Sequence, residues 1–477
     1  MTSPPYQTPL VTRYGGKEMA QLFSETKRIC TWRRVWIALA EAQHELGLAT
    51  IRREDIECLQ SAVEKIDWNR IQELEKETRH DVMAHVKAYG EVCPQAAGIL
   101  HLGATSAFVT DNADLILFRE ALKIIRVRLA HVMSELADFA REYRDHPTLG
   151  RTHYQPAQPT TVGKRATLWL ADLLLDWDDL TTLIDGLLLR GAKGTTGTQD
   201  SFLKLFEGDA DRVEELDQKI TEKLGFPGSF PVVGQTYPRK IDSRIFSVLS
   251  GLAQSAAKFA GDIRILSALG EMDEPMGVQQ VGSSAMPYKR NPMRSERISS
   301  IARLILSLSL NGPMTAMLQG FERTLDDSAN RRIALPEAFL ATDGILRLYG
   351  NIVRGLEVHN AQIRSHLEST IPFLASEEVL AAGVAAGGDR QVLHEGLRTH
   401  ARAASEEMRS GKSNDFFSRI GADPEFNQTQ ESLEALAQPE RFIGRSPAQV
   451  DRFLSRDVLP RIQPFLEQQT STFDIDV

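Results

Sequence analysis

Polar clusters that interrupt long apolar stretches contain the residues whose types could do chemistry. Histidines occur in two clusters, and arginines crowd another, where guanidinium groups match the oxygens of phosphates and carboxylates. One cluster of eleven residues combines serines, prolines, cations and an asparagine with almost nothing to bury, which indicates an exposed loop. In chain order the clusters are Arg79–Asp81, Gly103–Ser106, Thr152–Pro156, Gly282–Pro292 and Phe321–Arg332.

Four of the five clusters also have a purely structural interpretation. The loop Gly282–Pro292 could cap a following helix, and His153 could be a hydrogen-bonded structural histidine. His80 and Asp81 could form the polar face of a helix, and Arg331 could pair with neighbouring aspartates on a solvated face. Residue types and spacing alone leave both interpretations open.

Motifs for metal, dinucleotide and serine-hydrolase chemistry do not match. Gly191, Gly194 and Gly197 give G-x-x-G-x-x-G, which is not the dinucleotide-binding pattern, and no phosphate-binding G-x-x-x-x-G-K-[ST] is present. His80 and His85 are five positions apart, which is not the spacing of a zinc pair on a helix. No G-x-S-x-G sequence is present either, so these three chemistries have no motif support.

Long helices are expected to position the clusters. Apolar residues recur every three or four positions over five long stretches, whereas alternating strand-like runs are nearly absent. The sequence therefore predicts an all-α fold with a long central helical bundle over residues 107–358, flanked by two smaller, mostly helical domains at 1–106 and 359–477. The periodic stretches are 122–140, 170–189, 246–266, 298–308 and 333–356.

One of these stretches, Leu170–Leu189, is apolar around more than half of the helix circumference. A helix of this kind is buried on several sides, as in a bundle that associates with copies of itself. The sequence therefore favours self-association.

The composition excludes several classes of protein. The 477 residues are 42% hydrophobic and 25% charged, which is ordinary for a globular protein, and a net charge of −9 argues against a nucleic-acid surface. The three cysteines are widely spaced, which fits a reducing compartment. No signal-like apolar segment occurs before Gly16, and runs such as 115–118 fall short of the ~18 residues of a membrane span. We expect a cytoplasmic protein without membrane or nucleic-acid partners.

At the loop Gly282–Pro292 a family resemblance appears. Its sequence, G-S-S-A-M-P-Y-K-R-N-P, resembles the signature loop of the fumarase/aspartase superfamily, helical homotetramers that eliminate fumarate or a close relative from a substituted succinate. The likeness extends from about Arg13 to beyond Gly388. Other segments resemble the eukaryotic-type branch that acts on adenylosuccinate: R-H-D-V-M-A-H-V, L-G-A-T-S, T-H-Y-Q-P-A-Q, K-G-T-T-G-T-Q and F-E-R-T-L-D-D-S-A-N-R-R.

This resemblance implies a carbon–nitrogen lyase of purine nucleotide biosynthesis. Such an enzyme splits adenylosuccinate into AMP and fumarate, and it also releases fumarate from the succinylated aminoimidazole carboxamide ribotide. The resemblance implies that no metal and no organic cofactor takes part.

A β-elimination needs a base for a carbon-bound proton, an acid for the leaving nitrogen, and cations for the developing negative charge. The resemblance makes Ser283 the base and His153 the acid, with Ser284 as a rival base. Lys289 would stabilise the serine alkoxide and hold a substrate carboxylate. His80 would orient the substrate or support the acid.

The implied substrate is a polyanion with one phosphate and two carboxylates. Arginines, hydroxyls and amides at the matching positions would bind it, and Asp81 could fix the tautomer of its histidine neighbour. By resemblance, the nucleotide contacts are Arg13, Tyr14 and Arg297, the succinyl contacts are Thr105, Ser106, Thr152, Gln235 and Asn291, the phosphate contacts are Arg323, Ser328 and Arg332, and the remaining substrate-binding residues are Arg79, His80, Asp81 and Lys289.

Other functions compete with this one. A sibling enzyme with the same loop, such as an argininosuccinate lyase, would act on a substrate without phosphate and leave Arg323 and Arg332 idle. A non-catalytic relative, like the lens crystallins of this superfamily, would have no need of His153 or Ser283, and both are present. A regulatory module would bind AMP without releasing fumarate.

Overall fold

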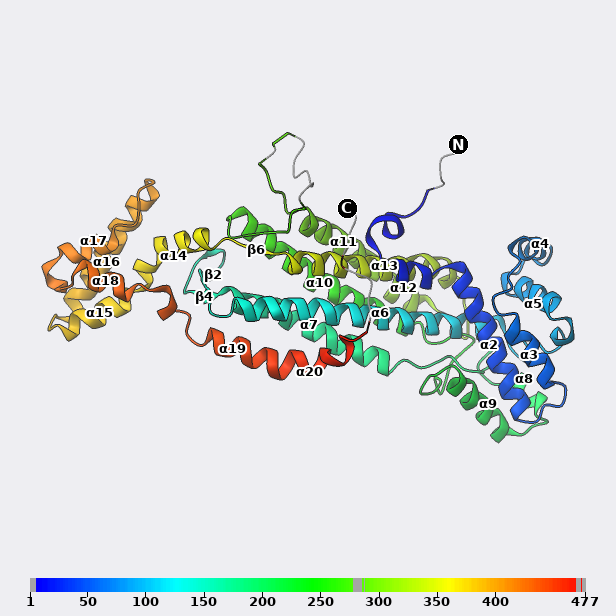
Figure 1. The fold of residues 1–477 in the computed structure, drawn as a ribbon. Coiled ribbons are helices and arrows are strands. Elements are labelled where there is room, and N and C mark those ends of the chain that lie inside the picture. The colour runs from blue at the N-terminus through cyan, green and yellow to red at the C-terminus, as the bar shows by residue number, and fades with distance from the viewer. Residues whose placement is uncertain (1–5, 278–284, 287, 469–472, 474–477) are drawn as a thin grey trace.

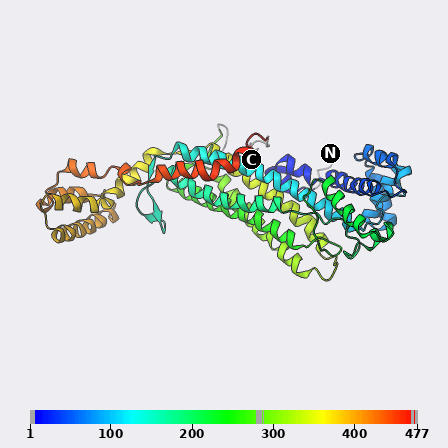
Figure 2. The same ribbon diagram turned by 90° about the horizontal axis from the view of Figure 1, so that it is seen from below.

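The protein is an elongated assembly of helices (Figure 1). The computed structural model describes residues 6–277, 285–286, 288–468 and 473. A bundle of long helices forms the middle, and groups of shorter helices lie at its two ends (Figures 1 and 2). The predicted all-α architecture is confirmed, whereas the domain boundaries after residues 106 and 358 stay predictions.

The five predicted long helices are all present. Each begins and ends within several residues of its periodic stretch, except that the first extends well beyond it at the N-terminal side. They are α6 (Ser106–Glu142), α7 (Val162–Asp185), α10 (Lys240–Ala268), α11 (Met293–Ser309) and α13 (Asp327–Arg354), with the short α12 (Asn311–Leu318) following α11.

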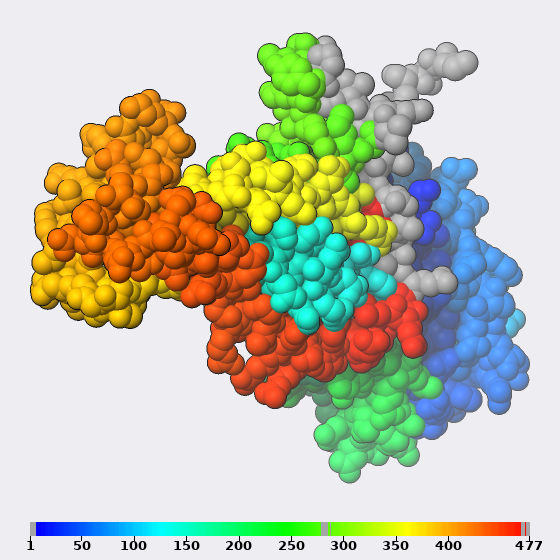
Figure 3. All heavy atoms as spheres, turned by 60° about the vertical axis from the view of Figure 1, so that its left-hand side comes forward, coloured from blue at the N-terminus to red at the C-terminus, as the bar shows by residue number. Residues whose placement is uncertain are grey.

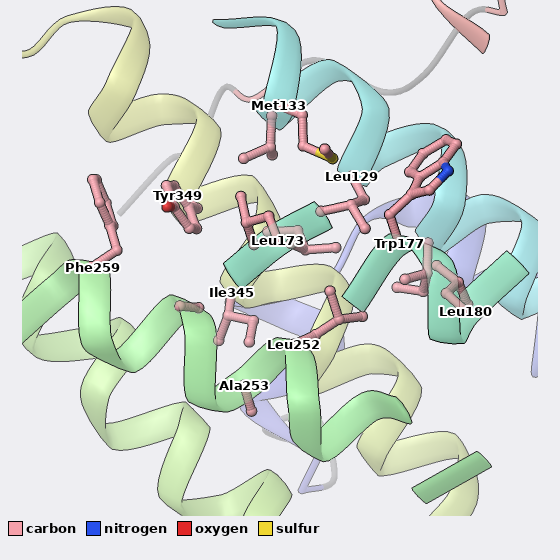
Figure 4. Close-up of a cluster of buried hydrophobic side chains, with 14 of the residues drawn as sticks. Leu129, Met133, Leu173, Trp177, Leu180, Leu252, Ala253, Phe259, Ile345 and Tyr349 are labelled. Atoms are coloured by element: carbon pink, nitrogen blue, oxygen red, sulfur yellow. The ribbon is translucent and has the colours of Figure 1, made fainter. Parts of the chain in front are cut away.

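The main hydrophobic core lies where α6, α7, α10 and α13 pack together. Its side chains are almost completely removed from water, and burying each large one stabilises the fold by about 1.5–3 kcal/mol. The rings of Phe259 and Tyr349 stack with their centroids 3.9 Å apart. Figure 4 shows this core with Leu129, Met133, Leu173, Trp177, Leu180, Leu252, Ala253, Phe259, Ile345 and Tyr349 labelled.

The helices at the N-terminal end share a second core. Trp32 and Trp36 on α2 pack there with Phe202 and Leu216, which come from a segment in the middle of the chain. The elements of this end are η1 (Leu10–Tyr14), α1 (Lys17–Leu22), α2 (Glu25–Glu45), α3 (Arg53–Ser61), α4 (Trp68–Thr78), α5 (Asp81–Val92) and η2 (Pro94–Ala96), joined by α8 (Asp200–Leu205) and α9 (Ala210–Lys223).

The C-terminal helices form a smaller core around Phe416 and Phe426 and then return to the bundle, where Val450 and Ile462 join the main core (Figure 1). The outer elements are α14 (Asn360–Leu374), α15 (Ser376–Ala385), α16 (Arg390–Arg409), α17 (Phe416–Ala422), η3 (Pro424–Phe426), α18 (Gln430–Leu436) and η4 (Pro439–Arg441). The returning elements are α19 (Ser446–Phe453), η5 (Leu454–Val458), α20 (Leu459–Ile462) and η6 (Gln463–Phe465).

Strands in the described residues are only two residues long, as the weak strand signals predict. One hairpin is built from two of the strand pairs and projects beside the bundle (Figure 2). Figure 3 shows its cyan surface between the yellow of α14 and the red of α19. The pairs are β1 (Pro147–Thr148) with β4 (Thr160–Thr161), β2 (Arg151–Thr152) with β3 (Gln155–Pro156), and β5 (Met272–Asp273) with β6 (Glu357–Val358).

The surface of α11 and α12 is unusually apolar. Residues 293–318 are long and hydrophobic enough to cross a membrane. Their most hydrophobic stretch of 18 residues has a mean hydropathy of 1.3, and 28% of that stretch is buried in the single chain. This segment contains no long run of consecutive apolar residues, because charged and polar side chains such as Arg303, Ser307 and Asn311 interrupt it. Its exposed side chains include Leu310, Met314 and Met317.

Candidate active site

A cavity of about 850 Å³ lies at the N-terminal end of the bundle. The helices α5, α6 and α13 all begin at its wall, and helix N-termini favour negatively charged ligands because their N–H groups point outward. The cavity brings together many of the predicted site residues: Arg79, His80, Asp81, Thr105, Ser106, Gln235, Arg323, Ser328 and Arg332.

His80 is held at the point where α5 begins. Its Nδ1 accepts the backbone N–H of Met83 at 3.4 Å, so the side chain caps the helix. Its Nε2 lies 3.4 Å from the hydroxyl of Ser106. Because Nδ1 acts as an acceptor, the neutral ring carries its proton on Nε2 and donates it toward the hydroxyl. Asp81, the residue expected to fix the tautomer of His80, makes only a long contact with it, since its carboxylate lies 3.6 Å from Nδ1.

Asp81 instead pairs across the cavity with Arg332, whose Nη2 donates to Oδ2 at 2.9 Å. Burial alone would raise the pKa of Asp81, but hydrogen bonds from the Val82 N–H and from Arg332 outweigh it and lower the pKa. The carboxylate therefore stays charged at neutral pH. This contact joins the start of α5 to the start of α13.

The floor of the cavity is a buried network of ion pairs. Arg239 contacts Asp111 at 3.1 Å and Asp327 at 2.6 Å, and it is 3% exposed. Arg331 contacts Asp242 at 2.6 Å and also hydrogen-bonds the hydroxyl of Tyr237. The suggested local pairing of Arg331 with neighbouring aspartates is therefore wrong, because carboxylates from α6 and α10 enclose this arginine within the fold.

Arg323 lies partly above this floor, 3.7 Å from Asp327. Its Nη1 atom is buried and has no hydrogen-bond partner among the described residues. Gln235 reaches the hydroxyl of Thr105 at 3.4 Å. A guanidinium N–H that makes a long ion pair and no hydrogen bond, beside amide and hydroxyl groups, is suited to the oxygens of a phosphate or carboxylate.

The other predicted site residues do not line this cavity in the single chain. Thr152 and His153 are exposed in the projecting hairpin, at its far end from the bundle. Both His153 and Tyr154 have positive φ angles, 54° and 59°, which suit the two-residue turn joining β2 to β3. The hairpin lies toward the C-terminal end of the bundle, and the elements around the cavity lie toward the N-terminal end (Figure 1).

The loop and N-terminal candidates are also outside the cavity. Lys289 is exposed, and Asn291 and Arg297 are half-buried near the start of α11. Arg13 is exposed on η1, and Tyr14 lines a separate cavity of about 400 Å³ beside α11. The predicted base Ser283 and its rival Ser284 lie outside the described residues.

Several cavity residues carry no sequence signal that could have found them. Arg28, Trp32 and Thr110 line the wall from helical positions that look like ordinary faces, and Arg239 follows a loop without a recognisable motif. Among the described residues, no group of three or more His, Cys, Asp and Glu side chains is arranged to hold a metal ion.

Comparisons with known proteins agree with this architecture. Residues 16–306 match a family model described as lyase, and residues 372–453 match one described as adenylosuccinate lyase C-terminus. The chain is 49% identical to the adenylosuccinate lyase of Saccharomyces cerevisiae and 46% identical to that of Schizosaccharomyces pombe, with 96% of each chain covered in both comparisons.

The fold resembles a solved structure of the 3-carboxy-cis,cis-muconate lactonizing enzyme from Pseudomonas putida. The TM-score is 0.80 at 24% identity, with 96% of this chain and 100% of that chain covered. That likeness shows the fold alone, whereas the two eukaryotic relatives show the family. The chain therefore belongs to the adenylosuccinate lyase family, and it is a carbon–nitrogen lyase.

Proposed function

We propose that this chain cleaves adenylosuccinate to AMP and fumarate, and the succinylated aminoimidazole carboxamide ribotide to the aminoimidazole carboxamide ribotide and fumarate. The observation that carries the proposal is the cavity, where three helix N-termini and the half-buried guanidinium of Arg323 face one space. Such a space suits a ligand with a phosphate and carboxylates. An argininosuccinate-type substrate would leave the cation-rich wall without a phosphate to bind.

In the proposed reaction, Ser283 removes the proton from the carbon beside a carboxylate. The C–H electron pair forms the double bond of fumarate, the C–N bond breaks, and its electron pair goes to the nitrogen. His153 donates a proton to that nitrogen, because histidine is the side chain that most often serves as a general acid or base. Lys289 stabilises the serine alkoxide, and His80 orients the substrate.

The phosphate is assigned to Arg323, Ser328 and Arg332, which lie together at the start of α13. Hydroxyl and amide groups would hold the succinyl part, and the N-terminal segment would contact the nucleotide. The succinyl set is Thr105, Ser106, Thr152, Gln235 and Asn291, the nucleotide set is Arg13, Tyr14 and Arg297, and Arg79 and Asp81 complete the wall.

We further propose that the protein works as a homotetramer in the cytoplasm, without nucleic-acid or membrane partners. The exposed apolar side chains of α11 and α12 support self-association, because an apolar surface of this kind is stabilised by covering it. The position of His153 on a projecting hairpin, away from the cavity, supports a site completed by other subunits. The three cysteines are free thiols, in keeping with a reducing compartment.

Mixing inactive variants tests the proposal. His153→Ala should lower kcat about 10²–10⁴-fold, the loss expected for a general acid. His394→Ala, at an exposed histidine of α16, is the matched control and should leave kcat unchanged. Fumarate release from adenylosuccinate is the readout.

Ser283→Ala should be similarly inactive. If His153 and Ser283 of one site come from different chains, random mixing of the two variants restores about a quarter of the sites. Subunit exchange is verified with tagged chains. Verified exchange without recovery would refute the shared site, and near-normal turnover of His153→Ala would refute its role as the acid.

A further inference from the structure

Outside the cavity, a fully buried carboxylate lies at the end of α10. Glu271 has a side-chain exposure of 0% and follows Gly270, which ends the helix with a φ of 70°. Charged carboxylates are costly to bury unless cations and hydrogen-bond donors surround them. Glu271 therefore needs partners, and those partners come from distant parts of the chain.

Three basic side chains converge on Glu271. Oε1 accepts a hydrogen bond from Nη2 of Arg151 at 3.2 Å and lies 2.7 Å from Nδ1 of His366. Oε2 faces Nη1 of Arg165 at 3.8 Å. One carboxylate thus connects the projecting hairpin, the start of α7 and the helix α14 to the end of α10.

Arg151 is the partner closest to the proposed chemistry. It lies in β2, two positions before His153, and its side chain is 19% exposed. Arg165 supports the same hairpin from its base, because its Nη2 donates to the carbonyl of Leu149 at 2.8 Å. Both arginines that contact Glu271 through their guanidinium groups therefore also fix the segment that leads to His153.

We propose that Glu271 is a positioning residue, which holds the hairpin through Arg151 so that His153 reaches the substrate in the correct orientation. This inference rests on the proposed function, in which His153 is the acid. Glu271 itself touches no reacting atom. A displacement of about 1 Å at an acid can lower a rate about 10²-fold, so the carboxylate can control turnover from a distance.

Glu271→Gln keeps the shape of the side chain and removes its charge. We expect kcat to fall about 10–100-fold while KM changes little, because Thr152 is the one assigned substrate contact in the hairpin and the phosphate contacts lie at the start of α13. Glu395→Gln is the control, since it makes the same substitution in an exposed pair with Arg398 on α16. Unchanged kcat in Glu271→Gln would overturn the proposal.

Arg151→Gln is the second variant, and it leaves Glu271 paired with Arg165 and His366 if Glu271→Gln fails to fold. It should give the same fall in kcat with little change in KM. The double variant should be no slower than the slower single variant, because both substitutions break one contact. Additive losses would show that Glu271 does not act through Arg151.

Mixing experiments separate positioning from general damage. A Glu271→Gln chain has a misplaced hairpin and an intact loop, so it should regain activity with Ser283→Ala and none with His153→Ala. Recovery only with His153→Ala would place the defect in the loop, and recovery with neither would indicate a subunit damaged throughout. Where His153→Ala and Ser283→Ala restore each other's activity, either result overturns the proposal; where they do not, the shared site of the proposed function fails instead.

The proposed function can fail separately. If His153→Ala turns over normally, the assignment of the acid is wrong whatever Glu271 does. If His153→Ala is inactive and Glu271→Gln is fully active, the acid stands and the positioning role falls.

Discussion

Replacing Arg332 by glutamine tests whether the start of α13 binds phosphate. The guanidinium is 55% exposed and its pair with Asp81, which is 33% exposed, is worth only about 0.2–1 kcal/mol. A hydrogen bond to a charged phosphate is worth about 1.5–3 kcal/mol. The difference is about 0.5–2.8 kcal/mol, so Arg332→Gln should raise KM for adenylosuccinate about 2–100-fold.

Turnover should change little, because this contact holds a group that does not react. The assay compares adenylosuccinate with the corresponding nucleoside, which lacks the phosphate. Only the nucleotide should lose affinity in the variant. Arg354→Gln is the matched control, since Arg354 lies on the same helix, is 53% exposed and pairs with Glu135 at 2.6 Å.

An equal rise in KM for both substrates would refute the assignment, because the lost contact would then not involve the phosphate. The variant also removes one hydrogen bond that lowers the pKa of Asp81. The carboxylate should consequently begin to protonate at a higher pH than in the parent enzyme, so the acid side of the KM profile should shift upward in pH.

Two further substitutions test buried charges by urea unfolding. Burial raises the pKa of Asp176 to about 6 despite a hydrogen bond with Ser255. The folded protein therefore binds more protons than the unfolded chain between about pH 4 and 6, and the free energy of unfolding falls as the pH rises through that range. Asp176→Asn should flatten this pH dependence and add on the order of 2 kcal/mol to the stability at pH 8, and an unchanged slope would contradict the prediction. Asp343 contacts Nε of Arg128 and the N–H of Gly16, both at 2.5 Å; Asp343→Asn should cost about 3–5 kcal/mol at pH 7, and a loss below about 1 kcal/mol would contradict the buried-pair account.

Helix positions follow from the sequence because each long helix buries an apolar stripe. In α10, for example, Phe246, Leu249, Ala253 and Ile263 repeat at helical spacing and all lie in the core. The helical spacing of these residues favours the helix itself, and their packing against neighbouring helices favours the bundle, so the local and the tertiary preferences agree. The periodic signal is therefore sufficient to predict the bundle.

Ion-pair partners do not follow from the sequence in this way. Asp327 and Arg331 stand four positions apart on α13, a spacing that favours a local pair on an exposed helix. In the fold both are buried, and a buried charge needs several hydrogen bonds from different directions. Arg239 and Asp242 supply them from another helix and its preceding loop, which only the tertiary structure brings close.

The cavity also shows why a polyanion site can be built over buried charges. The guanidinium groups of Arg239 and Arg331 are neutralised by carboxylates beneath the surface, so they hold the helices together and offer little net charge to a ligand. In the proposed function, recognition therefore depends on the more exposed arginines, Arg79, Arg323 and Arg332. Moving these side chains costs little free energy, because a solvent-screened ion pair such as that of Arg332 with Asp81 is weak. A ligand phosphate can displace it without disturbing the network that positions α6 and α13.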